Sequence, residues 1–326
     1  MNRKLDVVTF GEAMALFVAT QPGPLERADT FVKRTAGAET NVAIGLSRLG
    51  LRVGWASRIG DDSIGRYALA TMRGEGIDCD KVSSVAGQHS GFMLKGRVDD
   101  GSDPPIEYHR KGSAASQMDV DDVDAVWLRS ARHLHATGVF AALSPSTLRA
   151  AHASIELMRA GGGTVSFDPN LRPSLWESTS AMRDQVNALA RRAHWVMPGL
   201  EEGRLLTGQH SPEAIARHYR ECGVELVVIK LGASGAYCHG PSGTSYVPGV
   251  RVDTVIDTVG AGDGFAVGMI SALLEGQDPA NAARRGAWIG ALAVQTIGDT
   301  EGMPTRLQLQ TWEDSFVAAS DFQRVK

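Results

Sequence analysis

Short apolar runs rich in β-branched residues alternate with longer segments of helical period along most of this chain. The predicted strands are residues 5–10, 52–60, 133–138, 164–168, 195–197 and 226–230, and the predicted helices are 39–50, 61–76, 144–160, 178–193, 200–207 and 211–222. Asp61, after Gly60, is expected to open one of these helices, and Gly50 to close another. This alternation is typical of a parallel sheet with helices on both faces, so we predict an α/β fold.

Two regions, residues 12–36 and 89–112, interrupt this alternation. They lack a helical pattern, and the second contains the turn-rich sequence "DDGSDPP" between two stretches that read as antiparallel strands. Both regions leave the main sheet and return to it, so we predict that they form one small accessory β-sheet. A sheet that projects from the body in this way would serve as a lid over a single domain spanning residues 1–326.

The composition excludes several classes of function. The chain has 326 residues and a formal net charge of -4, so no general attraction to nucleic acid or to an anionic membrane is expected. No apolar run reaches membrane-spanning length, and the first residues lack the unbroken apolar core of a signal peptide. The three cysteines are too few and scattered for a disulfide framework or a metal site. We therefore expect a cytoplasmic protein.

The sequence "TVGAGDGF", residues 258–265, contains the strongest chemical signal. Gly260 and Gly262 allow an anionic ligand to approach the main chain, and a helix that starts near Ala261 would aim its first amide groups at that ligand. Asp263 would repel a ligand that is merely bound there, but it could accept a proton from a hydroxyl that attacks phosphorus. Taken alone, the segment favours the simpler interpretation, in which Asp263 caps the helix or interacts with its dipole, and only the surrounding motifs favour a base.

Two common phosphate-binding motifs do not describe this segment. No Gly-Lys-Ser/Thr follows it, as a Walker A loop requires. The third glycine of a dinucleotide-binding fingerprint would fall at Phe265, and that motif belongs near the first strand. The segment lies instead near the C-terminal end of the chain.

The segment "DTVGAGDGFAVG" (257–268) resembles the C-terminal signature of the ribokinase-like, or PfkB, family of carbohydrate kinases, and "AGAETNVAIGLSRLG" (36–50) with "RIGDDSIG" (58–65) resembles its N-terminal signature. The resemblance implies a three-layer α/β/α body with a small β lid. It also implies ATP and Mg²⁺ as cofactors, Asp263 as catalytic base, and Gly260, Ala261 and Gly262 as the anion hole.

Shorter matches, "GAETN", "YHRKGSAAS" (108–116) and "DPNLRPSLW" (168–176), resemble the members of this family that phosphorylate the terminal hydroxyl of 2-keto-3-deoxygluconate. This similarity implies that the residues that hold the sugar acid are Gly37, Asn41, Tyr108, Arg110, Arg172 and Asp263. An arginine suits the carboxylate of such a substrate because its planar group can donate two parallel hydrogen bonds. Met93 departs from the pattern, since a tyrosine often stands there.

Other readings of these residues remain open from the sequence. Arg110 with Lys111 could be a solvated charge pair, and Tyr108 could pack between lid and body. The histidines His133 and His135 alternate along a strand, but no third metal ligand accompanies them, so we expect a core or hydrogen-bonded role.

The resemblance also implies residues that contact the nucleotide: Asn170, Lys230, Gly232, Gly235, Gly260 and Gly262. Glu202 is implied to help order the magnesium ion, although the asparagine that usually precedes it is replaced by Gly199. Ala287 stands where the family often has an asparagine beside the adenine.

Three hypotheses follow for the function. The first is a kinase of a keto-deoxy sugar acid, and the second is a fructokinase or ribokinase-like kinase of a neutral sugar. The third is a sugar- or nucleotide-binding regulator without catalysis, motivated by the departures at Met93, Gly199 and Ala287. We also expect a homo-oligomer formed through the lid sheet.

Overall fold

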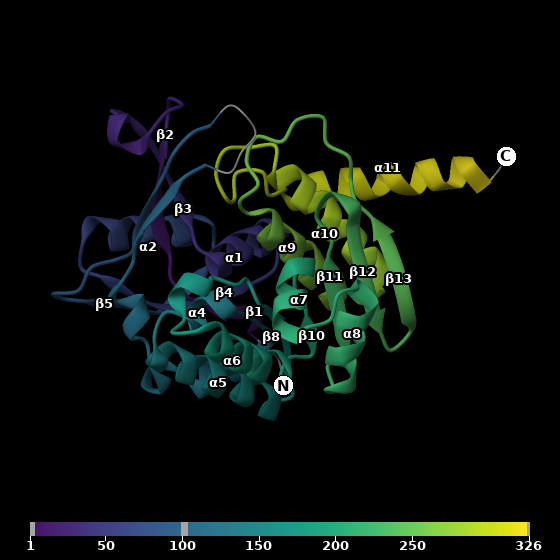
Figure 1. The fold of residues 1–326 in the computed structure, drawn as a ribbon, viewed down its shortest axis with the longest axis horizontal. Coiled ribbons are helices and arrows are strands. Elements are labelled where there is room, and N and C mark those ends of the chain that lie inside the picture. The colour runs from purple at the N-terminus through teal and green to yellow at the C-terminus, as the bar shows by residue number, and fades with distance from the viewer. Residues whose placement is uncertain (1–3, 99–103, 325–326) are drawn as a thin grey trace.

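The computed structural model describes residues 4–98 and 104–324, with side chains described as far as residue 315. Its larger sheet has nine strands (Figure 1) in the order β13 (Gly243–Pro248), β12 (Gly235–Gly240), β11 (Leu226–Lys230), β10 (Trp195–Val196), β9 (Thr164–Asp168), β8 (Ala131–Thr137), β1 (Leu5–Phe10), β4 (Val53–Gly60) and β5 (Asp78–Val85). The strands from β11 to β5 pair in parallel, whereas β12 and β13 form an antiparallel hairpin at one edge.

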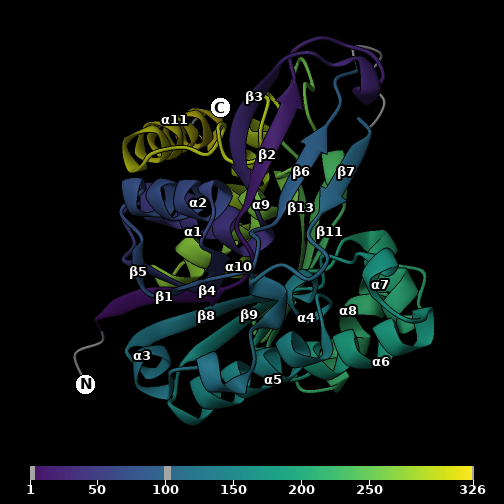
Figure 2. The same ribbon diagram turned by 90° about the vertical axis from the view of Figure 1, so that its left-hand side faces the viewer.

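The smaller sheet has four strands in the order β3 (Phe31–Ala36), β2 (Met14–Ala19), β6 (Phe92–Lys95) and β7 (Ile106–His109). All four lie within the segments 12–36 and 89–112, where the accessory sheet was predicted. Residues 99–103, most of the predicted turn between β6 and β7, lie outside the described residues. Figure 2 shows this sheet rising from the edge of the body beside α9.

Helices cover both faces of the larger sheet, so the body has the three layers that the resemblance implied (Figure 2). One face carries α1 (Ala38–Arg48), α2 (Ser63–Gly74), α9 (Ala261–Leu274), α10 (Pro279–Ala293) and α11 (Arg306–Arg324). The other face carries α3 (Ala125–Arg129), α4 (Gly138–Ala141), α5 (Pro145–Ala160), α6 (Thr179–Ala190), α7 (Leu200–Thr207) and α8 (Pro212–Glu221).

Each helix layer buries its apolar side chains against the sheet. Leu134, Val165 and Phe167 are fully buried beneath α5, while Val7 and Trp55 are buried under α1 on the opposite face. Burial of this apolar surface is the main force that holds the layers together. Among the described residues, no helix combines the length and the apolar character that crossing a membrane requires.

The predicted strands and helices of the body lie within a few residues of the observed ones, but one capping residue was wrong. Helix α2 is capped by Asp62, not Asp61, because the Asp62 carboxylate accepts a hydrogen bond from the Gly65 amide at 2.6 Å. Asp61 instead pairs with Arg66 at the surface. Strands β5, β12 and β13 and helix α10 were not predicted.

Candidate active site

Two cavities, each of about 410 Å³, adjoin one another at the carboxyl ends of the parallel strands. The first lies between the body and the smaller sheet, and the second lies beside α9, α10 and the β11–β12 turn. Lys230, Thr258 and Gly262 line both cavities, so these residues mark the boundary. Ligands of open α/β sheets bind at this edge because the loops that follow the strands converge there.

The boundary is formed by the amino-terminal end of α9. Gly260 precedes the helix with φ +85, and a Cβ atom at this position would lie 2.5 Å from the carbonyl oxygen of Asp299. The first intrahelical bond runs from the Gly264 amide to the Gly260 carbonyl, at 2.8 Å. The amides of residues 261–263 therefore precede the helical bonding pattern, and the positive end of the helix dipole is directed at the cavities.

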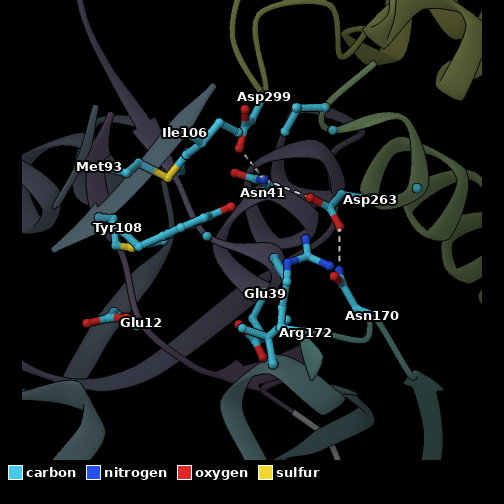
Figure 3. Close-up of a pocket in the computed structure, with 18 of the residues that line it drawn as sticks. Glu12, Glu39, Asn41, Met93, Ile106, Tyr108, Asn170, Arg172, Asp263 and Asp299 are labelled. Carbon is cyan, nitrogen blue, oxygen red and sulfur yellow. Dashed lines mark hydrogen bonds between the residues drawn. The ribbon is translucent and has the colours of Figure 1, made fainter. Parts of the chain in front are cut away.

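Asp263 lies in the first turn of α9, half-buried at the wall of the first cavity. The Asn41 amide donates a hydrogen bond to its Oδ2 at 2.7 Å, and the Asn170 amide approaches its Oδ1 at 3.5 Å (Figure 3). Burial raises the pKa of Asp263 to about 8, and the charges of Asp299 and Asp168 act in the same direction. A carboxyl group with a pKa near 8 suits a general base that works near neutral pH.

Asp299 is a second buried carboxyl group at this site, and the sequence did not indicate it. The Asn41 amide nitrogen, which binds Asp263, also donates to Asp299 Oδ2 at 3.2 Å. Burial raises the pKa of Asp299 to about 6. Its Oδ1, like Asn41 Oδ1, is buried and has no hydrogen-bond partner among the described residues. These two oxygens can therefore accept hydrogen bonds from a ligand in the cavity.

Lys230, the last residue of β11, is held at the boundary by a 2.6 Å ion pair with the buried Asp168. Burial by itself lowers the pKa of Lys230, but the carboxylates of Asp168 and Glu202 outweigh it and raise the pKa. The ammonium group therefore stays charged, which suits contact with phosphate oxygens. Gly262 lies beside it, since a Cβ atom there would be 3.5 Å from Lys230 Nζ.

Glu202 lines the first cavity, but both of its oxygens already accept hydrogen bonds. The Leu171 amide donates to Oε1 and the Gly199 amide to Oε2, each at 2.7 Å. Among the side chains that the structure describes, those of residues 4–98 and 104–315, no three His, Cys, Asp or Glu are grouped so as to hold a metal ion. Mg²⁺ keeps most of its waters and binds few protein ligands, so a magnesium ion held mainly by nucleotide phosphates, with Glu202 as the acidic side chain implied to order it, would be compatible with this cavity.

Two arginines line the first cavity, and they differ in burial and in ion pairing. Arg110 is buried and forms a 2.7 Å ion pair with Glu12, so the solvated charge pair considered for Arg110 is wrong. Arg172 is exposed, donates to the Leu171 carbonyl at 2.9 Å, and forms no ion pair with any described acidic side chain. In Figure 3 its guanidinium group points into the space bounded by Tyr108 and Asp263.

The remaining residues predicted to contact the substrate also meet at this cavity. Gly37 has φ +147, and a Cβ atom there would lie 2.3 Å from the Glu12 carbonyl oxygen. Tyr108 and Met93 approach from the smaller sheet, with the Tyr108 side chain directed inward (Figure 3). Tyr108 is 47% exposed, so it is not fixed by packing between lid and body.

The second cavity is mostly apolar, as an adenine site would be. Gly232 and Gly235 lie in the turn after β11 with φ +58 and +101, and both line the cavity. Val250, Val252, Val255, Phe265, Ala287, Ala291 and Val294 supply most of the apolar wall. Ala287 occupies the wall where the family pattern has an asparagine, so an adenine ring would lie here mainly against apolar side chains.

The histidines of β8 belong to the core, as predicted. His133 and His135 are 0% and 1% exposed, and both bind the Ser166 hydroxyl, at 2.8 and 2.9 Å. Burial lowers the pKa of His133 far below its usual value and that of His135 to about 3. Both side chains are therefore neutral at physiological pH.

Four acidic residues of the site carried no clear signal in the sequence: Glu12, Glu39, Asp168 and Asp299. Glu39 is 1% exposed, accepts a hydrogen bond from the Thr137 hydroxyl, and has its pKa raised to about 7 by burial. Glu12 lies just after β1 and Asp168 ends β9, at the edge of the sheet where ligands bind, whereas Glu39 lies in α1 and Asp299 in the loop after α10.

Comparison with known proteins agrees with this geometry. The model of the pfkB family carbohydrate kinases matches residues 4–306. The chain is 46% identical to 2-dehydro-3-deoxygluconokinase of Bacillus subtilis over 95% of each chain. The crystal structure of a PfkB protein from Polaromonas sp. JS666 is 62% identical, with a TM-score of 0.87, over 94% of this chain and 99% of that chain.

A fructokinase from Vibrio cholerae, crystallised with fructose, ADP and calcium, is 28% identical, with a TM-score of 0.83, over 94% of this chain and 98% of that one. The structural similarity extends over both sheets, because the superposed region includes nearly the whole of each chain. The predicted ribokinase-like α/β fold and the predicted family are thereby confirmed. This chain belongs to the pfkB family of carbohydrate kinases.

Proposed function

We propose that this kinase transfers the γ-phosphoryl group of ATP to the terminal hydroxyl of 2-dehydro-3-deoxygluconate, the compound also called 2-keto-3-deoxygluconate. The relative at 46% identity bears the name of this reaction. The observation that carries the substrate proposal is Arg172, whose guanidinium group lies in the same cavity as Asp263 without an acidic partner among the described residues. A sugar acid supplies that partner at one end and the reactive hydroxyl at the other.

We propose a separate role for the residues at each end of the substrate. Arg172 binds the carboxylate, while Tyr108, Gly37 and the free Oδ1 of Asn41 face the middle of the sugar acid. The terminal hydroxyl then lies against Asp263, which accepts its proton as the oxygen attacks phosphorus.

The phosphoryl group is received by the backbone amides that follow Gly260. Lys230 and the dipole of α9 balance the negative charge that spreads over the equatorial oxygens, and ADP departs into the second cavity. We propose that Gly232 and Gly235 lie against the nucleotide and that Asn170 assists its phosphates. Glu202 would help to order the magnesium ion that accompanies ATP, and that ion would neutralise part of the phosphate charge.

A substrate screen tests the proposal. ADP release is measured with 2-dehydro-3-deoxygluconate, its isomer 5-dehydro-2-deoxygluconate, fructose, ribose and nucleosides, each with ATP and Mg²⁺. We expect the highest kcat/KM for 2-dehydro-3-deoxygluconate. Rapid turnover of a neutral sugar with none of either acid would overturn the substrate and leave a sugar kinase, which is the second hypothesis.

The third hypothesis, a binding protein without catalysis, predicts no turnover of any sugar. The carboxylate of Asp263 argues against this hypothesis, because a protein that only bound an anion would gain nothing from a negative charge beside the α9 amides. Binding of ATP without ADP release from any compound in the screen would favour this hypothesis.

We further propose that the smaller sheet acts as a lid and joins two or more copies of the chain. Its outer face carries Phe17, Phe92 and His109, with Phe92 stacked on His109 at 4.6 Å and edge-on to Phe17 at 6.2 Å. A second lid would cover these apolar rings. Sedimentation equilibrium tests this, and a monomer at micromolar concentration would count against it.

The use of ATP and the presence of three free cysteines favour a cytoplasmic location.

A further inference from the structure

Lys95 and Asp257 form a buried ion pair that none of the roles above explains. Lys95 ends strand β6 of the smaller sheet and faces the body, and its Nζ lies 2.5 Å from Asp257 Oδ2. The two side chains are only 2% and 5% exposed. A buried ion pair is costly to desolvate and is weak evidence for a stabilising role, so its place in the fold has to account for it.

Asp257 holds the turn that leads into the anion hole. Its second oxygen, Oδ1, accepts a hydrogen bond from the Val259 amide at 3.1 Å, immediately before Gly260. The Ile256 and Asp257 amides both donate to the Val294 carbonyl at the end of α10, at 2.7 and 3.2 Å. The segment from residue 249 to residue 260 contains neither helix nor strand. Its conformation therefore depends on isolated contacts: the backbone hydrogen bonds to Val294 and the hydrogen bond from the Val259 amide to the Asp257 side chain.

The ion pair thus connects two parts of the site that are 162 positions apart in the sequence. One end is a strand of the smaller sheet, which covers the first cavity, and the other is the backbone that leads to the amides of residues 261–263. Lys95 also acts on a neighbouring carboxyl group: burial raises the pKa of Asp299, and the ammonium of Lys95 opposes that rise.

We propose that Lys95 is a positioning residue for phosphoryl transfer. Its ammonium group fixes Asp257, and Asp257 in turn fixes residues 257–260, so that the α9 amides face the migrating phosphoryl group when the smaller sheet covers the cavity. Lys95 lines neither of the two cavities, so it acts through Asp257 and is not a catalytic residue. The inference rests on the proposed kinase function, because it concerns the geometry of that reaction.

The test compares Lys95→Met, which keeps the length and removes the charge, with Lys95→Ala, which leaves a cavity. Misplacement of the anion hole should lower kcat about 100-fold in both variants, while KM for the sugar and Kd for ATP change by less than about threefold. Lys81→Ala is the matched control, since it removes a lysine from an exposed ion pair with Asp124 and should leave kcat unchanged.

Chemical rescue separates positioning from a general loss of stability. Methylammonium chloride should restore kcat of Lys95→Ala in proportion to its concentration, because the cation fits the space vacated by the side chain. It should not rescue Lys95→Met, whose side chain fills that space. Tetramethylammonium chloride at equal ionic strength cannot donate a hydrogen bond and should have no effect. Equal rescue by both salts would overturn the proposal.

A second variant keeps the test decisive if the single substitutions do not fold. Lys95→Met with Asp257→Asn leaves no unpaired buried charge, so it should fold, yet kcat should stay low because the link between sheet and turn is lost. Wild-type kcat in this double variant, or in Lys95→Met alone, refutes the positioning role. Failure of the wild-type protein to phosphorylate any sugar would instead refute the proposed function.

Discussion

The side-chain amide of Asn41 donates a hydrogen bond to Asp263 at 2.7 Å, joining residues 222 positions apart. Asn41 lies in α1, within the first sequence motif, and Asp263 lies in α9, within the last. The two helices pack together, and this contact orients the carboxyl group toward the first cavity. The proposed base is therefore oriented by a residue of the N-terminal motif.

Replacement of Asp263 by asparagine should remove the base and keep the shape of the site. We expect kcat to fall by about 10²–10⁴-fold, while Kd for ATP changes little. Asp61→Asn, at an exposed position, is the control. Steady-state kinetics with isothermal titration of ATP checks the prediction, and unchanged turnover would refute the assignment of Asp263 as base.

The same substitution should stabilise the protein at high pH. The pKa of Asp263 is raised from 3.8 to about 8, so the folded state favours the protonated carboxyl group. Its stability therefore falls progressively as pH rises from about 4 to about 8, and the loss is complete above the folded pKa. Asparagine cannot ionise. The Tm of Asp263→Asn should therefore exceed that of the wild type at pH 9 by a wider margin than at pH 6. Calorimetry at pH 6 and at pH 9 measures this difference in Tm, and an equal difference at the two pH values would contradict the raised pKa of Asp263.

The pH dependence of catalysis should reflect Asp263 and its neighbour Asp299. Because the base must be ionised, kcat/KM should rise with pH and level off above the pKa of Asp263, about 8. The charge of Asp299 contributes to raising that pKa, so Asp299→Asn should move the inflection to lower pH. A pH profile of both proteins tests this. An unmoved inflection in a folded, active variant would show that Asp299 does not act on the base.

Replacement of Arg172 by alanine should discriminate acidic from neutral sugars. A charge-assisted hydrogen bond to the substrate carboxylate is worth about 1.5–3 kcal/mol, so kcat/KM for the sugar acid should fall roughly 10- to 100-fold. Lysine at this position should restore only part of the loss, because it lacks the planar pair of donors. The control is Arg66→Ala, at the surface. Equal kcat/KM in wild type and Arg172→Ala would remove the main support for an acidic substrate.

The close approach of α9 and α10 should be sensitive to a single methyl group. A Cβ atom at Gly268 would lie 2.4 Å from the backbone nitrogen of Gly286, so Gly268→Ala must push the helices apart. We expect a loss of about 1–3 kcal/mol in the free energy of unfolding.

Gly74, in α2, provides the comparison for that substitution. A Cβ atom there would meet nothing within 4 Å, so Gly74→Ala should gain up to about 1 kcal/mol from helix propensity. Urea denaturation measures both variants. The packing argument fails if the two substitutions have the same sign and size.

Much of the architecture was predictable because it depends on local pattern. Strands 5–10, 164–168 and 226–230 have the predicted bounds, since each is a short, buried, apolar run. The hairpin of β12 and β13 was not predicted. β13 is an edge strand with mostly exposed side chains, and β12, although buried, is short and has glycine at both ends, so neither carries a strong apolar signal. Asp61 and Asp62 are adjacent capping candidates in the sequence, and only the folded turn selects Asp62.

The sequence by itself determined the α/β layering, the small sheet, the family and the turn that contains Asp263, because these depend on periodicity and on contiguous motifs. Only the tertiary structure decided which charges act together. It paired Arg110 with Glu12 and Lys95 with Asp257, left Arg172 facing the cavity, and placed Asp299 beside the base. These residues are distant in the chain, and a charge acquires its partner and its pKa only where folding brings it close to another and removes water from both.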